Sequence, residues 1–206
     1  MKKTAVILLI LLLVLPAMTF AQQQTLIKGK LSHGGFAGPV LKYSQMLDED
    51  ALLVGLRGGW IIGHSLYIGA AGYGLVNRIV SLRYESGPDS GMINHLGLGY
   101  GGLELGFILA SDRIVHIASQ VLFGAGGAMH TNRDNWEDFE WDMDEHDGDA
   151  FFILEPAIDI ELNVTSFFRI CIGASYRFIT GIEMDEFKNS DLNGFSGVFT
   201  LKFGRF

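Results

Sequence analysis

The longest stretch of regular alternation runs from Phe151 to Gly181 and consists of two segments joined by a short polar turn. In the first segment, apolar residues such as Phe152 and Ile160 share one parity, and acidic residues such as Glu161 share the other. A period of two residues is typical of a β-strand, because successive side chains point to opposite faces of a sheet. The apolar face is unbroken over about ten residues, the length that a membrane-crossing strand needs. The stretch therefore predicts a hairpin of two such strands.

Eight alternating runs of this kind follow one another along the chain. They cover roughly residues 35–44, 52–62, 66–76, 94–109, 115–125, 152–162, 168–178 and 196–203. Most connections alternate between short turns and long polar loops, the long ones at residues 77–91, 131–149 and 183–194, although the first connection, Met46–Asp50, is also short. Short turns at one rim and long loops at the other are the layout of a transmembrane β-barrel, in which every strand edge must be paired. We therefore predict an all-β fold: an eight-stranded antiparallel up-and-down transmembrane β-barrel.

Charged residues inside the runs fall on the parity opposite to the apolar face, so the predicted barrel places them in its lumen. An eight-stranded barrel has an interior just wide enough to be filled by side chains. Buried charges are costly unless they are paired, and we therefore predict a lumen network of ion pairs rather than an open pore. The predicted network contains five basic and four acidic residues: Lys42, Arg57, Glu104, Glu155, Asp159, Glu161, Arg169, Arg177 and Lys202.

Two local features interrupt the pattern. Pro156 lies in the middle of the sixth run and has no amide hydrogen for the strand ladder, so we expect a bulge there. Residues 97–102 match the spacing G-x-G-x-x-G of dinucleotide-binding turns, but alternating residues follow them where such a site requires a helix. We interpret these glycines as part of a tightly curved strand.

The N-terminus has the three parts of a secretory signal peptide. Lys2 and Lys3 give a positive start, Ala5–Leu15 is an apolar core, and Thr19–Ala21 provides small residues for cleavage. The core is shorter than the roughly twenty residues of a membrane-spanning helix. The predicted domains are a signal peptide at residues 1–21, a short N-terminal segment at 22–34, and the β-barrel at 35–206.

The chain is acidic, with a formal net charge of −8, and it carries no basic stripe, so we expect no nucleic-acid partner. Acidic residues crowd the loop between Asp134 and Asp149. Such oxygen ligands could hold calcium, but the EF-hand spacing places His146 and Ile153 where ligands are required. We expect a solvated loop and no bound cofactor. Six loop residues are candidates for contact with an unknown extracellular partner: Trp136, Phe139, Trp141, Asp142, Asp144 and Asp147.

The run pattern, the loop layout and the terminal Phe206 resemble the small eight-stranded outer-membrane β-barrel proteins of Gram-negative bacteria, the OmpA- and OmpX-like class, and most of all its uncharacterised outer-membrane barrels. The resemblance implies periplasmic termini, extracellular long loops, contact with outer-membrane lipid and insertion by the barrel assembly machinery. It also implies a last strand whose final Phe shares a parity with the preceding apolar residues. Phe206 has the opposite parity from Phe203, so a bulge near Gly204 is expected to bring them into phase.

Aromatic residues near the short turns and the termini predict a membrane-interface girdle at that rim. The residues assigned to it are Trp60, Tyr67, Phe107, Phe167 and Phe168 near the turns, and Phe36, Phe203 and Phe206 near the termini.

No catalytic arrangement is evident, so a non-enzymatic role, structural or in surface interaction through the acidic loops, is the main hypothesis. His116 and Ser119 lie in the same run but on opposite parities, so they cannot form a nucleophile and base pair directly. Two alternatives remain open. The first is a soluble, lipocalin-like periplasmic or secreted barrel that binds a small apolar ligand and has its apolar face inside. The second is a barrel enzyme that acts on membrane lipid.

Overall fold

The computed structural model describes residues 32–83, 93–131, 148–182 and 188–206. The predicted signal peptide, most of the 22–34 segment and most of the acidic loop lie outside these residues. The described part contains nine strands and one short helix. They are β1 (His33–Met46), β2 (Glu49–Ile62), β3 (Leu66–Leu75), β4 (Val80–Arg83), β5 (Ile93–Leu109), β6 (Val115–Thr131), β7 (Gly148–Asn163), β8 (Phe168–Thr180), α2 (Asn189–Leu192) and β9 (Gly194–Arg205).

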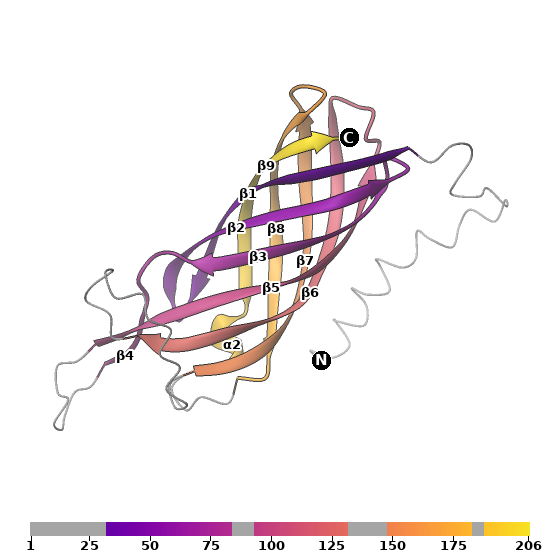
Figure 1. Cartoon of the computed structure of the whole chain (residues 1–206). Coiled ribbons are helices and arrows are strands. Elements are labelled where there is room, and N and C mark those ends of the chain that lie inside the picture. Colours follow the sequence, from indigo (N-terminus) through magenta and orange to yellow (C-terminus); the bar gives the residue numbers. More distant parts are fainter. Residues whose placement is uncertain (1–31, 84–92, 132–147, 183–187) are drawn as a thin grey trace, which may run out of the picture. The chain divides into compact units, whose positions relative to one another are not determined.

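The eight long strands close into a barrel. Each pairs antiparallel with its neighbour along the chain, and pairings of β1 with β9 and of β3 with β5 complete the ring (Figure 1). The predicted eight-stranded antiparallel up-and-down barrel is thus confirmed. We call the rim with the β2–β3, β5–β6 and β7–β8 turns the turn end; the C-terminus lies there, and the opposite rim is the loop end (Figure 1).

Alternation in β1 shows which face is inside. From Phe36 to Met46, even-numbered residues are buried and odd-numbered residues are exposed. Lys42 is buried although it is charged, and Leu41 and Tyr43 are exposed although they are apolar or aromatic. The barrel therefore keeps its charged strand residues inside and presents an apolar outer face. This finding contradicts the lipocalin-like alternative, which requires the apolar face inside.

The first strand and the first turn differ slightly from the prediction. β1 begins at His33 rather than near Gly35, because His33 pairs with Ile62. Its pairing with β2 continues to Met46, so the expected Met46–Asp50 turn shrinks to Leu47 and Asp48. Both turn residues have positive φ, 52° and 61°, as two-residue hairpin turns require.

The expected polar loop at residues 77–91 begins with ordered structure instead. β4 pairs with the start of β5 and so continues the course of β3 after a break of four residues. The side chain of Asn77 spans this break: its Oδ1 accepts from the Leu52 amide (2.7 Å) and its Nδ2 donates to the Asp50 carbonyl (2.6 Å). One asparagine thus replaces the backbone groups that a continuous strand would present.

The expected loop at residues 183–194 contains the single-turn helix α2, which lies at the loop end (Figure 1). The Oδ1 atom of Asn193 accepts from the Ile179 amide (2.6 Å), and that of Asn189 accepts from the Ile182 amide (3.0 Å). These bonds fix the helix to the end of β8, and they place Leu192 inside the barrel with no exposed surface.

Neither expected bulge is present. β7 keeps one register through Pro156, which pairs with Val121 in β6. Towards β8 the recorded pairs stop after Leu154 and resume in the same register at Ala157, so the missing donor causes only a gap in the ladder. The last strand also stays in register through Gly204. Phe206 therefore keeps the inward parity.

Glycines inside the barrel make room for aromatic rings on neighbouring strands. Tyr67 is the direct partner of Gly106, and Phe151 is the direct partner of Gly126. A Cβ atom on either glycine would collide with the opposite ring. Residues 97–102 lie wholly within β5, with no helix after them, as the curved-strand interpretation requires.

Candidate functional site

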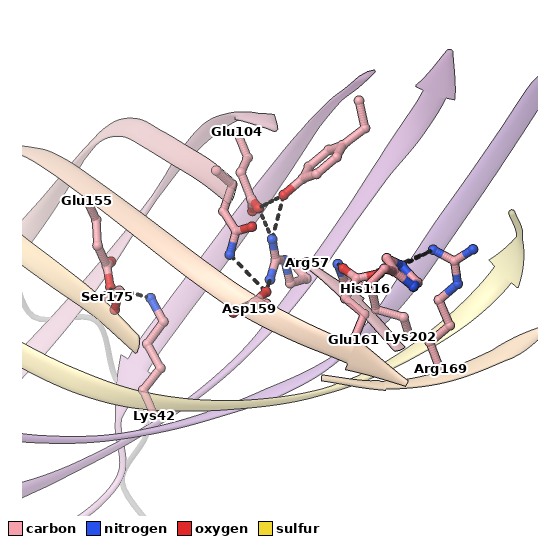
Figure 2. A network of polar contacts seen from close by, with 12 residues as sticks. Lys42, Arg57, Glu104, His116, Glu155, Asp159, Glu161, Arg169, Ser175 and Lys202 are labelled. Atoms are coloured by element: carbon pink, nitrogen blue, oxygen red, sulfur yellow. Dashed lines mark hydrogen bonds and ion pairs between the residues drawn. The ribbon is translucent and has the colours of Figure 1, made fainter. Parts of the chain in front are cut away.

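The nine charged residues predicted for the lumen are all buried inside the barrel, each with at most 4% of its surface exposed. They come from β1, β2, β5, β7, β8 and β9, and β7 alone supplies Glu155, Asp159 and Glu161. Figure 2 shows that the side chains of all but Arg177 meet in groups along the barrel, which are described in turn below.

The group nearest the turn end is centred on Glu161. Its Oε2 atom lies 3.1 Å from Nε2 of His116 and 3.2 Å from Nη1 of Arg169, and its Oε1 atom pairs with the Lys202 ammonium. The Arg169 guanidinium also stacks on the ring of Phe206, 3.8 Å from its centroid. One carboxylate thus balances several cationic groups, and no other acidic side chain is paired with them in the described residues.

The middle group is centred on Arg57. Its Nη1 atom lies 3.0 Å from Oδ2 of Asp159, and its Nη2 atom pairs with Glu104. The hydroxyl of Tyr67 accepts from Arg57 (2.7 Å) and donates to Glu104 (2.5 Å), and Gln120 donates to Asp159 (2.9 Å). Two carboxylates and one guanidinium share these bonds, so this group carries an excess negative charge.

The third group lies towards the loop end and is centred on Glu155. Lys42 Nζ lies 2.8 Å from its Oε1 atom, which also accepts from the Ser175 hydroxyl (2.5 Å). The Tyr100 hydroxyl donates to the other oxygen (2.9 Å). The same ammonium sits over the ring of Tyr73, 3.4 Å from its centroid, which adds a cation–π contact.

Arg177 stands apart from these groups. Arg177 in β8 and Glu155 in β7 are both on the inward face of the hairpin, but no ion pair joins the two. Its Nε atom donates instead to the carbonyl of Leu192 in α2 (2.8 Å), and its Nη2 atom donates to the Ser44 hydroxyl (3.3 Å).

Apolar clusters close the lumen on both sides of the charged groups. At the turn end, Phe36, Tyr67 and Phe206 pack with other inward residues. A cavity among the ion pairs has a volume of about 20 Å³, room for about one water molecule. The loop-end cluster includes Met46, Leu53, Ile79, Leu96, Phe151, Ile153, Ile179 and Leu192.

Sequence reasoning missed the loop-end cluster, although a signal for it exists. Phe151–Leu154 is apolar at four consecutive positions, and an apolar residue on both parities means that the inward face is apolar there too. It also missed the tyrosines that connect the ion pairs. Tyr67 was assigned to the outer girdle, and the structure corrects this.

The outer surface of the strands is a continuous apolar band. Leu56 is 68% exposed, Ile158 54% and Ile172 62%. Outward-facing residues of β6 from Val115 to Met129 include no charged side chain, and the same holds for β7 from Phe152 to Leu162. Monomeric soluble proteins rarely expose apolar surface on this scale.

Four of the eight residues assigned to the girdle at the turn end lie on the outward parity of their strands, and a fifth, Phe167, is exposed in the β7–β8 turn. The rings of Phe168 and Phe203 stack there with centroids 4.9 Å apart. Phe36 and Tyr67 point inward and are buried, and Phe206 packs against the buried cluster, so these three assignments were wrong. The outward strand residues are Trp60, Phe107, Phe168 and Phe203.

The other residues considered as candidates for partner binding, catalysis or metal binding do not form a site in the described part of the chain. All six candidate loop residues, from Trp136 to Asp147, fall outside the described residues. His116 is buried in the lumen and Ser119 faces outward, so the two are not in contact. Within the described ranges, no group of three or more His, Cys, Asp or Glu side chains could hold a metal ion. The described helix is too short to cross a membrane.

Comparisons with known proteins place the fold. No protein-family model matches the chain, and no curated protein matches it. Among solved structures, Neisserial surface protein A matches 86% of this chain and 99% of its own, with a TM-score of 0.55 and 12% identity. The N-terminal β-barrel domain of Pseudomonas aeruginosa OprF matches 82% of this chain and 96% of its own, with a TM-score of 0.51 and 9% identity. The chain thus has the fold of the small eight-stranded outer-membrane β-barrels.

Proposed function

We propose that this chain is exported by its N-terminal signal peptide and resides in the outer membrane as a non-catalytic β-barrel with a closed lumen. Its role is structural or lies in surface interaction through the acidic loops. The observation that carries the proposal is the distribution of side chains: nine charged residues and His116 are buried in the lumen, and large apolar side chains cover the outside. An apolar exterior is unfavourable in water and favourable in lipid, and charged side chains that face the lumen are kept away from the lipid.

The interaction role rests on the loop composition. The long loop after β6 combines aromatic residues, Trp136, Phe139 and Trp141, with carboxylates such as Asp142 and Asp144. Exposed aromatic side chains beside charges are typical of surfaces that contact a partner or lipid headgroups. In the proposed orientation these loops face the exterior, and the barrel holds them at the membrane surface.

The location is tested by gel mobility of the detergent-extracted protein from purified outer membranes. A folded barrel resists detergent at room temperature, so we expect the unboiled protein to migrate differently from the boiled protein. The matched control is the same extract after full denaturation in urea, which should remove the difference. Recovery of the protein in the soluble periplasmic fraction, with one mobility, would refute the proposal.

The closed lumen predicts that the barrel conducts no ions or small solutes. We expect liposomes that contain the purified protein to retain a trapped dye as well as protein-free liposomes do, because two apolar clusters and three ion-paired groups fill the interior. A known porin reconstituted at the same protein-to-lipid ratio is the positive control. Steady dye release at a rate proportional to the amount of protein would contradict the closed lumen.

A further inference from the structure

Arg177 is the one predicted lumen charge that no opposite charge balances. Of the nine charged lumen residues, the other eight all take part in ion pairs within the described part of the chain. Arg177 has no exposed surface, and its Nη1 atom has no hydrogen-bond partner. A guanidinium without a counter-charge in a barrel interior is unfavourable by several kcal/mol.

Among the described residues, no carboxylate is paired with Arg177 to supply that counter-charge. The Glu155 carboxylate already accepts from Lys42, Ser175 and Tyr100. The groups that Arg177 does contact, the Leu192 carbonyl and the Ser44 hydroxyl, are neutral.

A second unpartnered donor lies beside this arginine. Ser196 is the direct strand partner of Ser44, which holds Arg177, and also of Ser175. It is 2% exposed, and its hydroxyl has no hydrogen-bond partner. The lumen therefore holds a guanidinium N–H on β8 and a hydroxyl O–H on the paired strand β9, neither with a hydrogen-bond partner, and such donors are what an anion requires.

The charge count sets the valence of the ligand. Five basic and four acidic residues leave an excess of one positive charge when His116 is neutral. A cleft of about 840 Å³ at the loop end is lined by Ser44 and by Gly194, the strand partner of Arg177, and Arg177 and Ser196 themselves are buried beneath it. We propose that the lumen binds one small monovalent inorganic anion, of the size of chloride, between Arg177 and Ser196.

The test is thermal unfolding of the full-length mature protein in a non-ionic detergent. Sodium chloride replaces sodium gluconate in steps from 1 to 300 mM at constant ionic strength, because gluconate is too bulky for the site. We expect the midpoint to rise with chloride by about 3–6 °C for each tenfold increase above the dissociation constant. Arg177→Gln should abolish the dependence, and Ser196→Ala should weaken it. Arg78→Gln, which neutralises an exposed arginine, should leave the dependence unchanged.

Crystals grown in bromide provide a second measurement that does not depend on the variants folding. We expect an anomalous peak within hydrogen-bond distance of Arg177 Nη1. A wild-type midpoint that does not respond to chloride would overturn the proposal, as would an equal response in Arg177→Gln. A water molecule at this position, with no anomalous signal, would also overturn it.

Discussion

Glu161→Gln should lower the free energy of unfolding of the barrel by about 3–5 kcal/mol, the cost of removing one partner from a buried ion pair. The effect is large because Glu161 alone balances Arg169 and Lys202, and a neutral amide leaves both cations buried without a counter-charge. Urea unfolding in detergent or lipid vesicles, followed by the gel mobility of the folded form, measures the change.

Two further variants separate this electrostatic effect from a general loss of packing. Glu49→Gln removes the same charge at an exposed position and should change stability by less than about 0.5 kcal/mol. Lys202→Met in the background of Glu161→Gln removes one of the two cations that lack a counter-charge, and it should restore part of the lost free energy of unfolding. If the single variant at Glu161 unfolds like the wild type, the lumen pairs do not stabilise the barrel, and the account of its interior given above fails.

Ile158→Arg should destabilise the barrel in lipid by about 2–4 kcal/mol, the range for an arginine on the lipid face near the bilayer midplane. Ile158 is 54% exposed on the outer face of β7, about midway between Phe152 near the loop end and Asn163 at the turn end. The yield of folded protein in vesicles and the free energy of unfolding are the two readouts.

The matched control is Val164→Arg, which introduces the same side chain in the β7–β8 turn, where Val164 is 47% exposed. Near a membrane interface the cost should fall to about 0–1 kcal/mol. A soluble barrel would tolerate both arginines equally well, since both sites would then face water. Equal stability of the two variants would therefore reject a membrane location for this face.

Parity in the sequence was sufficient to predict the fold and the charged residues of the lumen, because alternation assigns strand residues to one of two faces. It could not predict which of the charged lumen residues form ion pairs with one another. The sequence places Glu155 near Arg177 on the inward face of the hairpin, but in the structure the Glu155 carboxylate bonds to Lys42 in β1. That contact crosses the lumen, and it depends on the stagger and tilt of the closed barrel, which a single strand does not encode.

The remaining errors have local causes. A proline on an outward position leaves one gap in the ladder without shifting the register, so the bulge expected at Pro156 is absent. Phe206 was expected on the lipid face because small outer-membrane barrels end in an outward-facing Phe, but the register of β9 does not shift at Gly204, so Phe206 stacks on Arg169. The short elements β4 and α2 are too brief to produce a periodic pattern of their own.

The ion pairs across the lumen also bear on how the barrel can assemble. Lys42 and Glu155 are 113 residues apart, and Arg57 and Asp159 are 102 apart. These contacts cannot form until β1 and β9 pair. An unclosed sheet would therefore have both charged side chains without ion-pair partners and strand edges without hydrogen-bond partners. Neutralisation and closure thus occur in the same step. Partly assembled forms should be scarce, and insertion should be cooperative. The last strand to pair completes the ring and brings the buried charges into their ion pairs.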